Sequence, residues 1–191
     1  IRLNGKDISP RSPLDAVKKG MAYITESRRD NGFFPNFSIA QNIAISRSLK
    51  DGGYKGAMGL FHEVDEQRTA EAQRELLALK CHSVNQNITE LSGGNQQKVL
   101  ISKWLCCHPE VIIFDEPTRG IDVGAKAEIY KVMRQLADDG KVILMVSSEL
   151  PEIITVCDRI AVFCEGRLTQ ILTNRDDMSE EEIMAWALPH E

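Results

Sequence analysis

The sequence predicts an α/β fold whose core is a parallel sheet. Val111 to Phe114 is an unbroken apolar run, and Lys141 to Ser147 carries a second one. Such runs are typical of parallel strands that are buried on both faces. A helical apolar pattern precedes the first run, over Asn95 to Cys107, and another separates the two, over Gly124 to Asp139. Strands that alternate with helices indicate a parallel sheet with helical cover.

Length and composition favour one domain, residues 1–191, with a sizeable core. The net charge is -5, whereas nucleic-acid binders usually carry a basic face, so no nucleic-acid partner is expected. The five cysteines have no metal-ligand spacing and indicate a reducing compartment. No apolar run reaches the roughly 18 residues that span a bilayer. We expect a soluble chain that meets a membrane only through a partner.

The first half of the chain predicts a hairpin, a strand and helices. Ile1–Ile8 alternates around an Asn-Gly turn signal, and Met21–Thr25 has a strand pattern that ends in the charged segment Glu26–Asp30. Helical patterns follow within Phe33–Leu49 and over Glu63–Lys80. We therefore expect a largely helical region before the Ser-Gly-Gly turn described next.

A Ser-Gly-Gly turn, Ser92 to Gly94, opens the helix predicted over Asn95 to Cys107. The first N–H groups of a helix have no partner within it, and glycine lets a bulky oxyanion approach them. The helix dipole adds roughly 0.3–1 kcal/mol for each negative charge. The turn therefore predicts an anion cradle.

Two adjacent carboxylates, Asp115 and Glu116, follow the apolar run at the point where the strand ends. Ligands of open α/β sheets bind outside the carboxyl ends of the strands. One carboxylate there suits a hydrated Mg²⁺ ion, and the other suits an attacking water.

The rest of the chain predicts structure without chemistry. Gly140 is a natural end for the helix before the second apolar run, and a short helix is expected over Glu152–Cys157. Asp158–Leu172 predicts an antiparallel hairpin that closes the sheet edge. Ser179 and Glu182 form a capping box for a last helix.

The order of the motifs resembles an ABC-type ATPase. Leu91-Ser-Gly-Gly94 resembles its signature motif, Asp115-Glu116-Pro-Thr118 after the apolar strand its Walker B motif, and the loop to Asp122 its D-loop. The signature variant Asn95–Lys98 and the strand end Val146–Glu149 are similar to the second ATPase half of bacterial sugar importers of the ribose, galactose and allose class. Family-like motifs extend from residue 5 to about residue 186.

This resemblance implies a P-loop NTPase-like ABC domain. A helical signature subdomain would be inserted at about 33–107, and 108–191 would hold Walker B, the D-loop and the rest of the sheet core, with antiparallel hairpins at its edges. The sequence contains no G-x-x-x-x-G-K-S/T motif, and the glycine-rich stretch Gly52–Gly59 lacks that pattern. We therefore expect a chain truncated before its Walker A loop.

The resemblance also implies roles for particular residues. Asp115 would hold Mg²⁺ through water, once a Walker A loop is supplied, and Glu116 would be the other catalytic residue. The residues implied to bind the nucleotide are Ser92, Gly93, Gly94, Gln96, Asp122, Glu26 and Ser148.

Two of these residues depart from the usual pattern. Glu26 stands where many ABC ATPases have the Q-loop glutamine, and the alternative for this segment is a solvated charged turn. Ser148 stands where most have a switch histidine. Serine can donate a hydrogen bond but cannot become a cation near pH 7, so we expect an impaired hydrolytic site in this half.

The function implied is that of an ATP-binding subunit that energises import of a monosaccharide, D-allose or a similar sugar, with ATP and Mg²⁺. Its partners would be a second ABC ATPase half with an intact Walker A, the transmembrane sugar permease and, indirectly, a periplasmic binding protein, at the cytoplasmic face of the inner membrane. Phe33, Phe34 and Phe37 would contact the permease or belong to the helical core. The alternatives are a truncated interaction module without catalysis and a non-transport ABC ATPase.

Overall fold

The computed structural model describes residues 1–51 and 63–189. The chain divides into two compact units, Ile1–Leu144 and Met145–Glu191, which we describe separately. The glycine-rich stretch 52–59 lies outside the described residues. The organisation as a single domain with an inserted helical subdomain stays a prediction.

A three-stranded sheet in the order β3-β4-β5 forms the centre of the first unit. Its strands are β3 (Met21–Ile24), β4 (Val111–Asp115) and β5 (Val142–Val146), and the boundary between the two units falls within β5. β3 and β4 run parallel, with Met21 opposite Val111 and Ile24 opposite Phe114. The parallel pairing confirms the predicted α/β fold.

The two faces of this sheet differ in cover. Ile24, Ile112 and Phe114 are fully buried on one face. On the other face Tyr23, Val142 and Leu144 are 49%, 56% and 54% exposed. The expectation that both apolar runs are buried strands is therefore wrong for β5 and holds for only one face of β4. Side chains alternate between the faces of a strand, and the described part of the chain covers one face well and the other poorly.

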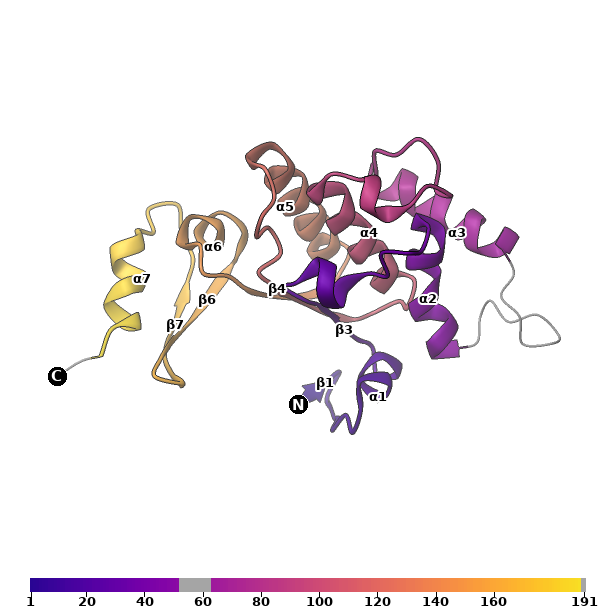
Figure 1. Cartoon of the computed structure of the whole chain (residues 1–191). Helices are drawn as coiled ribbons and strands as arrows, with labels where there is room; N and C mark the ends of the chain where they lie inside the picture. The colour runs from indigo at the N-terminus through magenta and orange to yellow at the C-terminus, as the bar shows by residue number, and fades with distance from the viewer. Residues whose placement is uncertain (52–62, 190–191) are drawn as a thin grey trace. The chain divides into compact units, whose positions relative to one another are not determined.

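Helices supply the rest of the first unit. They are α1 (Pro13–Lys18), α2 (Ile39–Asp51), α3 (Glu63–Leu76), α4 (Gly93–Leu105) and α5 (Val123–Asp138). α4 packs between α2 and α5 and also contacts β3, and most of its residues are buried (Figure 1). α5 ends before Gly140, whose φ of 83° allows the chain to turn, as the sequence predicts.

The N-terminal hairpin is also as predicted. β1 (Arg2–Leu3) and β2 (Lys6–Asp7) pair antiparallel across Asn4 and Gly5, which have φ angles of 49° and 74°. Positive φ at both central positions is the geometry that an Asn-Gly turn favours. No helix within the described ranges is both long and apolar enough to cross a membrane.

The second unit is a hairpin packed with two helices. β6 (Arg159–Cys164) and β7 (Arg167–Thr173) pair antiparallel, beside α6 (Leu150–Val156) and α7 (Glu180–Ala187). Its core contains Ile160, Val162, Met178 and Ile183. The hairpin is confirmed, but the expectation that it closes the edge of the parallel sheet is wrong, because β6 and β7 form a separate two-stranded sheet. Ser179 caps α7 by accepting from the Glu182 amide at 3.2 Å, as the capping box predicts.

Candidate functional site

The site begins at the carboxyl end of β4. Asp115 is the last residue of the strand, and Glu116 follows with a φ of +47°. This left-handed conformation is uncommon for a residue with a side chain. Two short turns then lead the chain to α5. In the first, the Arg119 amide donates a hydrogen bond to the Glu116 carbonyl at 3.2 Å, and in the second the Ile121 amide donates to the Thr118 carbonyl at 3.1 Å.

A tyrosine on the neighbouring strand orients the Asp115 carboxylate. The Tyr23 hydroxyl donates to Asp115 Oδ2 over 2.5 Å. This hydrogen bond, more than burial, raises the pKa of Tyr23, so the phenol remains a donor at neutral pH. Sequence reasoning missed Tyr23, because 92 positions separate it from its partner along the chain.

The donor set at Asp115 suits Mg²⁺. Carboxylate oxygen is the ligand type that Mg²⁺ prefers, and the ion usually takes one or two carboxylates together with waters and phosphate oxygens. Within residues 1–51 and 63–189, no group of three or more His, Cys, Asp or Glu side chains is placed to hold a metal by itself. Asp115 therefore fits a single protein contact to a hydrated ion and not an all-protein cage.

The start of α4 fits the predicted anion cradle. Ser92 is the N-cap residue, with extended backbone angles, but its side chain makes no capping hydrogen bond. Its Oγ instead accepts from Asn95 Nδ2 at 2.9 Å, and the side chain is exposed. Since no cap side chain occupies the first-turn N–H groups, they can face an anion beside Ser92 and Gly93, whereas Gly94 is buried.

Gln96 has partners inside the protein. Its side chain is buried, and Nε2 donates to the carbonyls of Leu91 at 3.1 Å and of Ile88 at 3.4 Å. These bonds fix the short 3₁₀ turn Ile88–Glu90 ahead of the Ser-Gly-Gly turn. The structure thus gives Gln96 a supporting role, and its contact with a nucleotide stays a prediction.

Gly94 allows α4 to approach α5 closely. A Cβ built at Gly94 would lie 2.6 Å from the Ala125 Cβ, which no real pair of atoms tolerates. Ala125 belongs to the first turn of α5, and its amide donates to Asp122 Oδ1 at 2.9 Å, so Asp122 caps that helix. The Ser-Gly-Gly turn can therefore pack against the start of α5 only because residue 94 has no side chain.

Gly94→Ala should destabilise the protein by about 1–2 kcal/mol, because overpacking costs about 1–3 kcal/mol and the helix propensity of alanine returns up to about 1 kcal/mol. Urea unfolding measures the difference. Ala125→Gly removes the opposing methyl, so the double variant should be less destabilised than the sum of the two single variants. Additive losses would contradict the close contact.

Charged side chains connect the segment after β3 with the loop after β4. Glu26 forms an ion pair with Arg119. Arg28 donates through Nη1 to the Arg119 carbonyl at 2.7 Å and through Nη2 to the Gly120 carbonyl at 3.3 Å. The Arg119 and Glu26 side chains remain 68% and 41% exposed, so a nucleotide-binding role for Glu26 stays a prediction. Arg28 and Arg119 are further residues of the site.

The structure thus brings most candidate residues into the first unit. The loop after β4 links Asp115, Glu116 and Asp122 to Glu26, and the same loop borders Gly93 and Gly94. Ser148 belongs to the second unit, where it is exposed just after β5. Its role beside the other residues stays a prediction.

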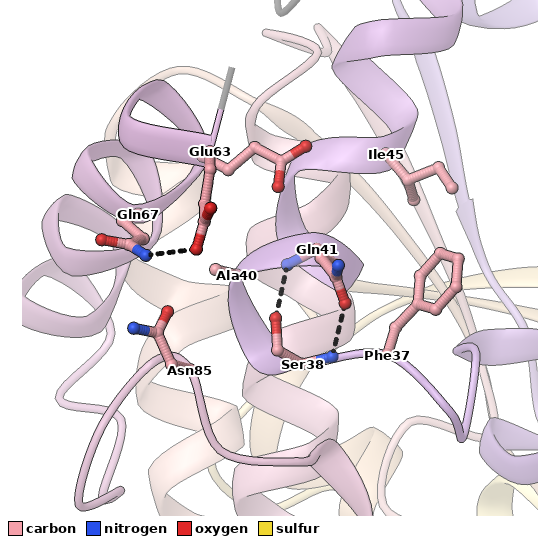
Figure 2. A pocket seen from close by; sticks show the side chains of 9 residues that line it. Phe37, Ser38, Ala40, Gln41, Ile45, Glu63, Gln67 and Asn85 are labelled. Atoms are coloured by element: carbon pink, nitrogen blue, oxygen red, sulfur yellow. Dashed lines mark hydrogen bonds between the residues drawn. The ribbon is translucent and has the colours of Figure 1, made fainter. Parts of the chain in front are cut away.

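A hollow of about 330 Å³ lies beside α2 and α3. Figure 2 shows Phe37, Gln41 and Ile45 on one side and Glu63 and Gln67 on the other. Ser38 and Gln41 exchange two hydrogen bonds at its edge, of 2.9 and 3.2 Å. Of the three phenylalanines predicted as permease contact or core, Phe33 is buried and Phe34 is 48% exposed, so the group contributes both to the core and to the surface.

Comparison with known proteins gives the family of the chain. Residues 1–119 match the family model described as ABC transporter. The chain is 98% identical over 191 residues to the D-allose import ATP-binding protein AlsA of Escherichia coli (strain K12) and covers 38% of that protein. It is 46% identical over 189 residues to the ribose import ATP-binding protein RbsA of Bacillus cereus, of which it covers 37%. The chain thus spans well under half the length of these relatives.

Solved structures share the fold. A nucleotide-free ATP-binding cassette from an ABC transporter superimposes with a TM-score of 0.74 at 21% identity, over 95% of this chain and 70% of the other. A dimeric ATP-binding cassette in a post-hydrolysis state, bound to ADP and Pi, superimposes with a TM-score of 0.72 at 20% identity. The match covers 91% of this chain and 72% of the other. Since the family model covers residues 1–119 of 191, the chain belongs to the ABC transporter family.

Proposed function

We propose that the chain is part of an ATP-binding subunit that energises monosaccharide import, of D-allose or a similar sugar. The observation that carries this proposal is the 98% identity over all 191 residues to a D-allose import ATP-binding protein. The relative at 46% identity is a ribose import protein, which supports the wider sugar class.

The first-unit site supports ATP chemistry. Phosphoryl transfer spreads negative charge over the γ-oxygens, and fixed donors stabilise that charge better than mobile water. A bound Mg²⁺ would neutralise charge on the phosphates. Asp115 would hold its water shell, with Tyr23 fixing the carboxylate, and Glu116 would orient the attacking water. At Ser148 only a neutral hydrogen bond is available, which favours a weaker site in this half.

Two partners complete the proposed assembly. The sequence has no G-x-x-x-x-G-K-S/T motif, so a phosphate-binding loop must come from outside these residues. We propose that a second ATPase half carries one and that Ser92, Gly93 and Gly94 close over its ATP. The hollow beside α2 and α3, which Phe37 lines, offers a surface to a sugar permease at the cytoplasmic face of the membrane. A periplasmic binding protein would deliver the sugar, and no nucleic acid takes part.

The test is ATP hydrolysis by this chain alone and after addition of an ATPase half with an intact phosphate-binding loop. We expect activity only in the mixture, because the signature turn then completes a site in trans. Activity in neither, with both proteins folded by circular dichroism, would reject the proposal.

A second candidate is an interaction module that binds no ATP, which the missing phosphate-loop motif favours. Titration of the chain with a fluorescent ATP analogue, in the presence of the partner half, separates the two candidates. Co-purification with permease subunits, as opposed to ribosomes or DNA, separates transport from other roles of ABC ATPases.

A further inference from the structure

One guanidinium group joins three segments of the first unit. Arg28 donates to the backbone carbonyls of Arg119 at 2.7 Å and of Gly120 at 3.3 Å. It also borders α4, because a Cβ at Gly93 would lie 3.4 Å from Arg28 Nη2 and equally far from the Gly120 carbonyl oxygen. The segment after β3, the loop after β4 and the first turn of α4 therefore meet at Arg28.

Arg28 is itself held in place by α4. It begins a π-helical turn, Arg28–Gly32, a rare conformation that is frequent at functional sites. At the other end of this turn Lys103 donates to the Gly32 carbonyl, and a Cβ at Gly32 would lie 2.6 Å from Leu100 Cδ2. Both residues lie in α4. The turn is thus fixed to the body of α4 at one end, while Arg28 holds the loop after β4 at the other.

Partial burial of Arg28 has a free-energy cost. Burial, with a smaller effect from Arg29, lowers the pKa of the Arg28 guanidinium, yet the group stays charged. Its Nε is buried and has no hydrogen-bond partner among the described residues. A charged group and an unmatched donor are expensive to bury. The planar guanidinium donates to two successive carbonyls at once and so fixes their position. The ammonium group of lysine cannot reproduce this geometry.

We propose that Arg28 is a positioning residue that sets the loop Arg119–Asp122 against the first turn of α4, and thereby aligns Ser92 and Gly93 for ATP turnover. The inference rests on the proposed function. Arg28 acts through backbone carbonyls of the loop and not on the nucleotide. Its loss should therefore lower the rate of the chemical step and leave the affinity for ATP nearly unchanged.

The first test uses the full-length subunit with its partner ATPase half. Arg28→Gly should lower kcat about 10–100-fold, because small misplacements of reacting groups have effects of that size, while KM for ATP changes less than about threefold. Millimolar guanidinium, but not sodium chloride at the same ionic strength, should restore part of kcat by occupying the vacated space. Arg28→Lys should lie between wild type and Arg28→Gly.

Arg29→Gly is the matched control, because Arg29 is the exposed neighbour in the same turn. Equal loss in Arg28→Gly and Arg29→Gly, or a kcat for Arg28→Gly equal to wild type, would overturn the proposal. So would the absence of any guanidinium rescue.

A second measurement keeps this inference separate from the proposed function. In hydrogen exchange, Arg28→Gly should speed exchange of the amides of Gly120 and Ile121 and leave β6 and β7 unchanged. Unchanged exchange at both loop amides would overturn the positioning role, whether or not the protein hydrolyses ATP. A wild-type assembly without ATPase activity would instead reject the proposed function.

Discussion

Ser92→Arg is expected to lower ATP hydrolysis by the full-length subunit and its partner about 100-fold or more, which is the usual cost of removing a fixed donor from a charge-stabilising site. Ser92 is exposed at the start of α4, where its side chain leaves the first-turn N–H groups uncapped. A long arginine side chain there would block the approach of a partner's nucleotide to these groups. The loss would show that the signature turn, in trans, is the main contribution of this chain.

Glu116→Gln should lower the rate of ATP hydrolysis much less than Ser92→Arg does, by under about tenfold. A working general base usually contributes about 10²–10⁴ in rate. The loss is smaller here because the carboxylate pair belongs to the half with Ser148 at the switch position, which we expect to be the weaker site. Steady-state ATPase rates of the two variants give the comparison. Ser83→Arg, at another exposed serine of the first unit, controls for the added charge and bulk. Equal losses at Ser92 and Glu116 would contradict this division between two composite sites.

The free energy of unfolding should rise as the pH increases from about 8 toward 10.5 because of one buried lysine. Lys103 is 7% exposed, donates to the Gly32 carbonyl and lies 5.2 Å from the centre of the Trp104 ring. Burial lowers its pKa from 10.5 to about 8. Between these values the folded chain has released a proton that the unfolded chain still binds, so stability increases with pH. A shift of this size corresponds to about 3 kcal/mol.

The measurement is urea unfolding from pH 7 to 10 of the wild type and of Lys103→Met. Cys106 titrates in the opposite sense, because burial raises the pKa of its thiol to about 12 and its contribution is lost at high pH. The difference between the two proteins largely cancels that effect. Lys103→Met also removes the hydrogen bond to Gly32, which changes the free energy of unfolding at every pH. The prediction therefore concerns how steeply the free energy of unfolding changes with pH. Parallel pH profiles would show that Lys103 titrates normally.

Periodicity in the sequence was enough to locate the helices and strands, but it did not show which of their faces are buried by other segments. The helix predicted over Asn95–Cys107 is found two residues earlier, at Gly93–Leu105, and the strand at Val111 is one residue longer than expected. The exposure of Val142 and Leu144 was not predictable. An apolar run shows that residues are suited to burial, but not which segment covers them.

The site divides in the same way. Motif order located Asp115, Glu116 and the Ser-Gly-Gly turn, because their spacing along the chain is local. Tyr23 and Arg28 act on residues 91 or 92 positions away, so their roles depend on strand pairing that no local pattern reveals. Gln96 lies within the signature motif, yet its hydrogen bonds point into the protein.

Glu116 has a left-handed backbone conformation, with a φ of +47°, so stability and chemistry favour different residues at this position. Glycine is the residue that adopts this conformation without steric cost, and strained positions of this kind cost on the order of 1–3 kcal/mol. Selection for a stable fold alone would therefore favour glycine at position 116 and remove the carboxylate. A library of variants sorted only by thermal stability would enrich the substitution that abolishes this acidic group, so stability and ATPase activity must be selected together.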